Sequence, residues 1–283
     1  MEPSRVFADG VLAGQVALVT GGGTNLGKAA AAELARCGAS VIIAGRREDV
    51  LEAAAAEIGS DCSYAVGDIR ERAGQEALVH ASLKRHGRLD FLLNNAGGQY
   101  FVPAESIAQK GWRAVQRLNV EGTLGMCQAA HDLAMGPARS GTIVNVSVSP
   151  HQGFPAMAHT GAARAAVEAF TRELADRWAS ENVSVAAVAL GRFATESLRK
   201  YPAELWQKAA ASVPLQRLGT VEEYGWLVAL LASPLGSAFS GSVLTLDGAL
   251  DNWHGPWPPP DLTRDGQVPT EERRAAGEAA TRP

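Results

Sequence analysis

Short runs of apolar residues alternate along the chain with longer alanine-rich segments that repeat with a helical period. The apolar runs are rich in valine, isoleucine and leucine, as buried strands are, and the segments between them are long enough for crossover helices. This alternation predicts the α/β class, with seven parallel strands in one doubly wound sheet. The expected strands are residues 15–20, 40–45, 62–68, 89–95, 141–147, 183–190 and 242–248.

Residues 103–137 and 155–181 are predicted to form the two longest helices. We interpret their alanine-rich faces as surfaces for tight packing against the sheet or against a neighbouring subunit. The single domain built from these elements is expected to span residues 11–250, after an N-terminal tail at residues 1–10.

The composition changes at the C-terminal tail, residues 251–283. Consecutive prolines continue neither a helix nor a strand ladder, so the tail from Pro258 onward is expected to be irregular. Trp253 and Trp257 have two interpretations, because tryptophan is seldom left wholly solvated. They either pin the tail to the domain or line a substrate pocket.

Composition narrows the class of protein. The 283 residues are 46% hydrophobic, which is enough for one large core, and 26 Lys+Arg against 30 Asp+Glu leave a net charge of −4, with no basic excess for nucleic acid. Cys37, Cys62 and Cys127 are too scattered for a disulfide framework or a metal site and indicate free thiols in a reducing compartment. No apolar run approaches the ~20 residues that span a bilayer, so a cytoplasmic protein with a small-molecule substrate is expected.

The segment TGGGTNLG, residues 20–27, lies between the first expected strand and the first helix. Glycines in this position allow a tight turn that brings the N–H groups of the helix N-terminus to a pyrophosphate. The chain therefore contains a candidate dinucleotide site. Its predicted phosphate loop includes Gly21, Thr24, Asn25, Leu26 and Gly27.

Further motifs follow in the order found in the short-chain dehydrogenase/reductase superfamily, which the chain resembles over about residues 11–250. They are Asp68 in VGDI, NNAG at 94–97, Asn119 in LNVEG, Ser147 at the end of a strand, RLGTVEE at 217–223 and LDG at 246–248. Asn25 departs from the family's loop, which has its middle glycine there, but asparagine tolerates a positive φ. The resemblance implies a Rossmann-type fold and a homotetramer built on the two long helices.

The resemblance also implies the contacts of the cofactor. The residues that would surround its adenine, its ribose and its carboxamide are Asp68, Ile69, Asn95, Ala96, Gly97, Gly191 and Thr195. Where an NAD enzyme has a carboxylate after the second strand, this chain has Arg46 and Arg47, whose guanidinium groups suit a 2′-phosphate. NADPH is therefore the predicted cofactor, and the other interpretation of the two arginines is an ordinary charged helix start.

Most members of the superfamily reduce a ketone with a serine, a tyrosine and a lysine. Counted from Ser147, the tyrosine position holds Thr160 and the lysine position holds Arg164. A threonine hydroxyl is far too weak an acid to replace a phenol near neutral pH, and an arginine can grip ribose hydroxyls but cannot shuttle a proton. Ketone reduction by the usual route is therefore disfavoured.

Reduction of a conjugated double bond needs less acid, because hydride addition at Cβ of an enoyl thioester leaves an enolate that positioned donors stabilise. Residues 94–115 and 153–178 resemble the branch that contains trans-2-enoyl-CoA reductases and 2,4-dienoyl-CoA reductases. That branch commonly lacks the motif tyrosine. In its dienoyl enzymes an asparagine, matched by Asn119, and a second tyrosine, which falls at Ser149, bind the thioester oxygen.

We therefore predict NADPH-dependent reduction of the C=C bond of an enoyl thioester of CoA or of a carrier. Asn119, Ser147 and Ser149 would polarise the carbonyl, and Arg164 would orient the ribose. His151 would protonate Cα, because the pKa of histidine lies near neutrality, although a packing role is the other interpretation of this residue. The predicted substrate contacts are Gln99, Tyr100 and Trp206, with Tyr100 as a second candidate donor.

Two other functions stay open. The branch also resembles bacterial dehydrogenases of terpenoid alcohols such as citronellol, which would reduce NAD(P)⁺ with an alcohol. With neither tyrosine nor lysine in the motif, the fold could instead be a non-redox biosynthetic catalyst or regulator, which would bind NADPH tightly and consume no hydride.

Overall fold

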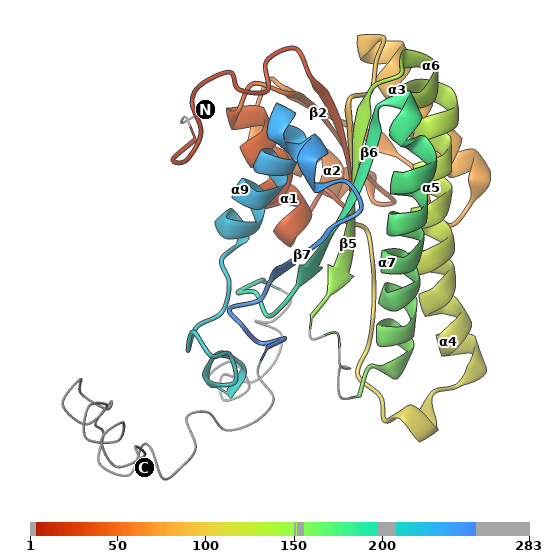
Figure 1. Ribbon diagram of the computed structural model, residues 1–283, viewed down its shortest axis with the longest axis vertical. Coiled ribbons are helices and arrows are strands. Elements are labelled where there is room, and N and C mark those ends of the chain that lie inside the picture. Colours follow the sequence, from red (N-terminus) through yellow and green to blue (C-terminus); the bar gives the residue numbers. More distant parts are fainter. Residues whose placement is uncertain (1–3, 150, 152–155, 197–207, 253–283) are drawn as a thin grey trace, which may run out of the picture.

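One seven-stranded sheet organises the chain, and all its strands run parallel in the order β3-β2-β1-β4-β5-β6-β7 (Figure 1). The computed structural model describes residues 4–149, 151, 156–196 and 208–252. The strands are β1 Val16–Thr20, β2 Ser40–Gly45, β3 Cys62–Val66, β4 Phe91–Asn94, β5 Gly141–Val148, β6 Val183–Leu190 and β7 Val243–Leu246. The predicted fold class and all seven predicted strands are confirmed. β1 and β6 are buried at every residue, which explains their continuous apolar runs.

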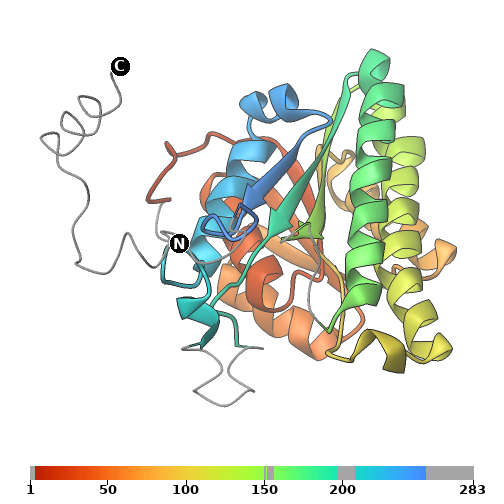
Figure 2. The ribbon, with the colours of Figure 1, turned by 60° about the horizontal axis from the view of Figure 1, so that its bottom comes forward.

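Helices cover both faces of the sheet (Figure 1). One face carries α1 Asn25–Arg36, α2 Glu48–Ile58 and α9 Val221–Ala232, and the other carries α3 Arg72–His86, α5 Gly122–Ala130 and α7 Ala158–Trp178. Each face has its own apolar core, with Leu34 and Tyr224 fully buried in the first and Leu78 and Met126 fully buried in the second. Figure 2 shows α7 beside the α4–α5 helix, with the sheet between this pair and α9.

The first long helix begins later than predicted. A 3-10 turn, Ala104–Ser106, follows Pro103, and the backbone is extended at Ile107 and Ala108 before α4 Gln109–Gln116 begins. The helix then continues to its end with two π-helical turns in it, through Arg117–Glu121, α5, His131–Met135 and α6 Gly136–Ala138. The apolar pattern does not reveal these π-helical turns. Each adds one residue to a single helical turn, and no residue type marks the place where this happens.

The second long helix predicted from the sequence is present, but it begins later than predicted. It comprises α7 and a 3-10 turn, Ala179–Glu181, and therefore begins three residues after the predicted start at 155. A 3-10 helix, Pro234–Phe239, precedes β7. No helix in the described part of the chain is long and apolar enough to cross a membrane.

The sheet changes winding direction between β1 and β4. From β1 the chain passes outward to β2 and then β3, and it returns to β4 on the other side of β1. Ligands of doubly wound sheets bind outside the carboxyl ends of the strands at such a switch point. The turns that follow β1, β2, β4, β5 and β6 all lie at this edge. Every residue proposed from the sequence as a cofactor contact belongs to these turns, to the first turn of α1, to the residues after β3 or to α7.

Candidate active site

A cavity of about 420 Å³ lies at the switch point. Its lining includes every predicted cofactor contact except Arg164 and Gly191, and it also includes Gln99, a predicted substrate contact. The lining residues that sequence reasoning did not name as contacts are Gly23, Ala44, Gly45, Val50, Leu51, Gly67 and Leu118. Several of these are apolar residues that carry no motif, so only their place in the fold identifies them.

The glycine-rich loop after β1 is tightly packed. A Cβ atom built on Gly27 would lie 2.3 Å from the carbonyl oxygen of Gly21, so no side chain fits there. Asn25 adopts the left-handed conformation with a φ of 47°, and its Oδ1 accepts the N–H of Glu196 at 3.0 Å. Asparagine thus occupies the position of the family's glycine without distorting the turn, and it ties the loop to the segment after β6.

Guanidinium groups gather where the second strand ends. Arg46 and Arg47 line the cavity, and so does Asp68, which follows β3. Arg70 clamps Asp68 with its Nε atom at 2.9 and 3.0 Å from the two carboxylate oxygens. The hydrogen bonds from Arg70 are the main reason that the pKa of Asp68 falls to about 2, and the charge of Arg46 lowers it further. The carboxylate is therefore already paired, and Arg46 and Arg47 leave this rim with a positive charge.

The side-chain amides of Asn95 and Asn119 form hydrogen bonds with backbone groups of the protein. Asn95 Nδ2 donates to the carbonyl oxygens of Thr20 at 3.1 Å and Gly21 at 3.3 Å, which joins the ends of β1 and β4. Asn119 Oδ1 accepts the N–H of Gly98 at 3.2 Å, and its Nδ2 donates to Gly98 and Val115 at 2.9 Å each. Since both amide hydrogens of Asn119 are already donated, its geometry fits a residue that holds the Gly98 loop better than a donor to a thioester.

Arg164 extends from α7 to the ends of β4 and β5. Its Nη1 donates to the carbonyl oxygen of Val146 at 2.7 Å, and its Nε has no hydrogen-bond partner in the described part of the chain. Burial lowers the pKa of Arg164 to about 10, so the side chain remains a cation near neutral pH. One turn earlier, Thr160 is fully buried and its hydroxyl also has no partner within the described residues. Two polar groups of α7 are thus desolvated without a hydrogen-bond partner in the described part of the chain.

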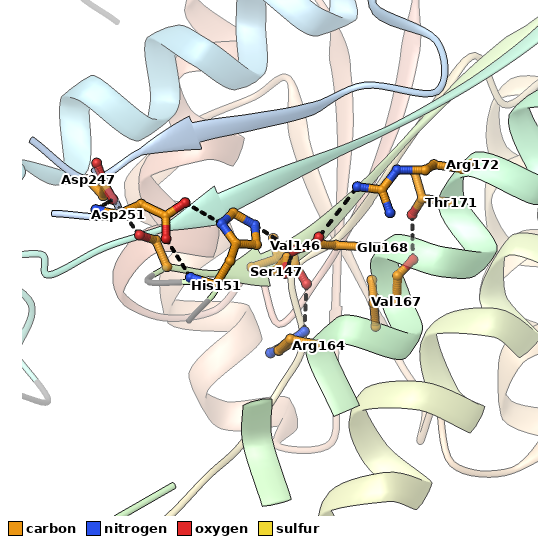
Figure 3. Close-up of polar contacts among 11 residues, drawn as sticks. Val146, Ser147, His151, Arg164, Val167, Glu168, Thr171, Arg172, Asp247 and Asp251 are labelled. Carbon is orange, nitrogen blue, oxygen red and sulfur yellow. Dashed lines mark hydrogen bonds and ion pairs between the residues drawn. The ribbon is translucent and has the colours of Figure 1, made fainter. Parts of the chain in front are cut away.

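Ser147 does not face the tyrosine position but a carboxylate. Its hydroxyl donates to Glu168 Oε1 at 2.6 Å, and His151 Nε2 lies 2.8 Å from the same oxygen (Figure 3). The other ring nitrogen of His151, Nδ1, lies 2.5 Å from Asp251 Oδ2, and the backbone N–H of His151 donates to Asp251 Oδ1 at 2.6 Å. The structure therefore connects Ser147, Glu168, His151 and Asp251 in one chain of polar contacts.

Sequence reasoning missed Glu168. The signal was available, because Thr160, Arg164 and Glu168 are spaced by four residues and a helix brings such positions to one face. All three are buried. A carboxylate two turns after the tyrosine position was therefore on the face that carries the site.

The C-terminal segment also contacts the serine loop at Ser149. The Ser149 hydroxyl donates to Asp247, and a Cβ atom built on Gly191 would lie 2.5 Å from Cβ of Asp247. Gly191 is thus needed for packing, and Ser149 is engaged with a carboxylate. Asp251, the first residue of the predicted tail, contacts His151 directly.

The predicted substrate residues Gln99 and Tyr100 lie in different surroundings. Gln99 lines the cavity, whereas the ring of Tyr100 packs edge-to-face on His159 with centroids 4.5 Å apart and places its hydroxyl over Gly111 of α4. His159 is fully buried, and neither ring nitrogen has a partner in the described ranges. Trp206, Trp253 and Trp257 lie outside the described residues, so their predicted roles stay predictions.

The fold agrees with what comparison with known proteins finds. The family model described as enoyl-(acyl carrier protein) reductase matches residues 22–250. The peroxisomal 2,4-dienoyl-CoA reductase, (3E)-enoyl-CoA-producing, of Danio rerio is 34% identical over 253 residues, which cover 87% of this chain and 84% of the relative. The probable 2,4-dienoyl-CoA reductase, (2E)-enoyl-CoA-producing, of Bacillus subtilis (strain 168) is 34% identical over 251 residues, covering 85% and 97%.

Among solved structures, the chain is similar to a citronellol catabolism dehydrogenase of Pseudomonas aeruginosa PAO1. The TM-score is 0.78 at 36% sequence identity, and the match covers 87% of this chain and 98% of that one.

Proposed function

The chain belongs to the short-chain dehydrogenase/reductase superfamily of oxidoreductases, and we propose that it uses NADPH to reduce a carbon–carbon double bond conjugated to a thioester. The observation that carries this proposal is the set of polar groups around Ser147. A buried carboxylate, Glu168, accepts the serine hydroxyl. The tyrosine position holds Thr160, whose hydroxyl has no hydrogen-bond partner among the described residues.

This set of groups suits an enolate better than an alkoxide. A ketone becomes an alkoxide that must be protonated at oxygen by an acid as strong as a phenol, and threonine is not such an acid. An enolate spreads its charge over the thioester, so hydroxyl donors and a nearby cation stabilise it. Within the described residues, the Thr160 hydroxyl and the Nε of Arg164 are buried without hydrogen-bond partners, which suits this task.

The lining of the cavity at the switch point supports NADPH as the cofactor of this proposal. Gly21 and Gly27 leave no room for side chains at the phosphates, and Arg46 and Arg47 match the charge of a 2′-phosphate. Arg164, beside Gly97, would hold the nicotinamide ribose. When bound, the cofactor supplies the hydride, and the protein supplies orientation, charge and one proton.

We assign separate roles to the residues predicted to be catalytic. Ser147 faces Glu168 and is the hydroxyl through which a proton reaches the substrate. Asn119 and Ser149 position the Gly98 loop and Asp247, respectively, and act through them. The names of the relatives favour a thioester of CoA, and a 2,4-dienoyl thioester extends the same conjugation by one double bond.

The test measures NADPH oxidation with crotonyl-CoA, longer trans-2-enoyl-CoA thioesters and 2,4-hexadienoyl-CoA, with acetoacetyl-CoA as the ketone control. We expect turnover with at least one unsaturated thioester and much slower turnover with the ketone. NADPH binding by titration without turnover of any unsaturated thioester would contradict the proposal.

A second candidate, oxidation of a terpenoid alcohol, is favoured by the match to the citronellol catabolism dehydrogenase at 36% identity. Reduction of NADP⁺ or NAD⁺ by citronellol, with no oxidation of NADPH by thioesters, would select it. Tight NADPH binding with neither activity would select the non-redox scaffold.

A further inference from the structure

His151 lies between two carboxylates that come from different parts of the chain. Its Nε2 is 2.8 Å from Glu168 on α7, and its Nδ1 is 2.5 Å from Asp251, which follows β7 (Figure 3). Both ring nitrogens are thus within hydrogen-bond distance of a carboxylate oxygen. The contact of its backbone N–H with Asp251 fixes the ring's position from a third side.

This geometry requires one shared proton between His151 Nε2 and Glu168 Oε1 and another between His151 Nδ1 and Asp251 Oδ2. A neutral imidazole carries only one N–H, so its bare nitrogen would face a carboxylate oxygen lone pair to lone pair. The ring is therefore either a cation that donates to both carboxylates, or neutral with a proton on one carboxyl group. Transfer of the proton from His151 Nε2 to Glu168 Oε1 leads from the cation to a neutral ring beside a protonated Glu168. The hydrogen bond between these two atoms is kept during the transfer.

The charged groups around the ring favour the cation. Glu168 and Asp251 face His151 directly, Asp247 accepts the backbone N–H of Asp251 at 2.7 Å, and Arg172 lies 3.7 Å from the far oxygen of Glu168. Burial alone would lower the pKa of His151, but the hydrogen bond to Asp251 and the charges of Glu168 and Asp251 outweigh it and raise the pKa above its ordinary value. The two carboxylates therefore favour the protonated form of His151.

Exposure falls along the chain of contacts. The side chain of His151 is 33% exposed, that of Glu168 is 10% exposed, and Ser147 is fully buried. A proton can therefore enter from solvent at His151 and cannot enter at Ser147. Glu168 Oε1 contacts both neighbours, so a proton that arrives on this oxygen from Nε2 already lies beside the serine hydroxyl.

We propose that His151 is a positioning residue that reloads Glu168 with the proton delivered through Ser147 to the substrate. The inference rests on the proposed function, whose reduction consumes one hydride and one proton. The O–H bond of Ser147 breaks as a C–H bond forms at the substrate α-carbon. His151 Nε2 passes its proton to Glu168 Oε1, Glu168 passes a proton on to the Ser147 oxygen, and water in the solvent reprotonates His151. Asp251 holds the ring in line and keeps it protonated.

The first test does not depend on activity. NMR titration of isotope-labelled histidine in the whole protein without cofactor gives the pKa of His151, assigned by its loss in His151→Ala. We expect this pKa to lie above the ordinary value of about 6.5 and to fall in Asp251→Asn, which is isosteric and keeps an oxygen for the His151 backbone N–H. An ordinary pKa that Asp251→Asn leaves unchanged would overturn the proposal.

The second test uses the pH dependence of turnover. In the wild type, kcat with the best thioester should fall as pH rises through the pKa of His151, and Asp251→Asn should move this fall to lower pH without changing the Kd of NADPH. His151→Ala should lower kcat about 10- to 100-fold at neutral pH, with partial rescue by added imidazole, as for a lost acid–base group. An unchanged kcat and pH profile in both variants would overturn the proposal.

A matched control lies at the other end of α7. His131, in the π-helical turn that follows α5, also lies between two carboxylates, with Nδ1 3.0 Å from Asp132 and Nε2 3.0 Å from Glu181, which follows the C-terminal end of α7. Glu181→Gln should leave the pH profile of kcat unchanged, which separates proton loading from a general effect of losing a carboxylate beside a histidine.

The two proposals fail differently. A wild type that turns over no thioester contradicts the proposed function, and with it delivery of the proton to a substrate, whatever the titration shows. An active wild type with normal His151→Ala and Asp251→Asn variants contradicts the role of His151 alone.

Discussion

Arg164 lies so close to Gly97 that a Cβ atom on residue 97 would sit 2.3 Å from Nη2 of the arginine. No pair of non-bonded atoms tolerates that distance, so only glycine lets the guanidinium lie against the loop after β4. Gly97→Ala should therefore displace Arg164 from the Val146 carbonyl oxygen. Overpacking costs about 1–3 kcal/mol, so we expect the Kd of NADPH to rise about tenfold or more, as measured by fluorescence titration.

Gly161→Ala is the control for this change. Gly161 is on the same helix as Arg164, and a Cβ atom there would meet nothing within 4 Å. NADPH affinity should stay the same, and the free energy of unfolding should rise by about 0.5–1 kcal/mol, because alanine favours a helix over glycine. Equal NADPH affinity in the two variants would show that Arg164 does not depend on Gly97.

Arg46 and Arg47 should determine which dinucleotide binds. Both line the cavity, and replacing both with alanine removes the charge that faces a 2′-phosphate. Hydrogen bonds between charged groups are worth about 1.5–3 kcal/mol, so the Kd of NADPH should rise more than tenfold while the Kd of NADH changes little. Isothermal titration with both dinucleotides measures this.

Arg177→Ala removes one arginine from an exposed pair with Glu173 on α7, where the two groups are 3.8 Å apart. It tests whether loss of positive charge alone weakens NADPH binding, and we expect no change. A parallel loss of affinity for NADPH and NADH in the Arg46/Arg47 variant would instead favour the interpretation of these residues as an ordinary helix start.

Arg164 should contribute more to the free energy of NADPH binding than to the free energy of unfolding. It is a buried cation whose hydrogen bond to Val146 is not matched by an ion pair in the described part of the chain, and burial lowers its pKa to about 10. Replacing a buried charge by an apolar side chain of similar volume is often neutral or stabilising. Arg164→Met should change the free energy of unfolding without cofactor by less than about 2 kcal/mol and should abolish measurable NADPH binding.

Urea unfolding with and without NADPH distinguishes these effects, and Arg164→Lys, which keeps the charge, should retain part of the affinity. Strong destabilisation of the cofactor-free Arg164→Met variant would mean that the arginine is mainly a structural residue.

The contact between His151 and Asp251 should make stability depend on pH. The folded-state pKa of His151 is raised, so its contribution is fully present below the unfolded value, about 6.5, and is lost as pH rises through the folded value. The difference in free energy of unfolding between the wild type and Asp251→Asn should therefore be largest near pH 6 and shrink in alkaline solution. Urea unfolding at a series of pH values measures it, and a difference that stays constant with pH would contradict the assignment of the proton to His151.

Much of the fold followed from local patterns. Residues 183–190 form an almost continuous apolar run because β6 is buried at every residue. The glycine-rich turn after the first strand identified the edge of the sheet where the cavity lies. The start of the first long helix was wrong by six residues, since the extended backbone at Ile107 and Ala108 leaves no mark in the apolar pattern.

By itself, the sequence determined the α/β class, the parallel sheet, the glycine-rich loop after the first strand and the exchange of the motif tyrosine and lysine for Thr160 and Arg164. Each of these depends on residue type and short-range spacing. Only the tertiary structure decided what surrounds Ser147. Its carboxylate partner Glu168 is 21 residues away, and His151 meets Asp251 across 100 residues. No local rule relates residues so far apart, because the packing of α7 and of the segment after β7 against the end of β5 brings them together.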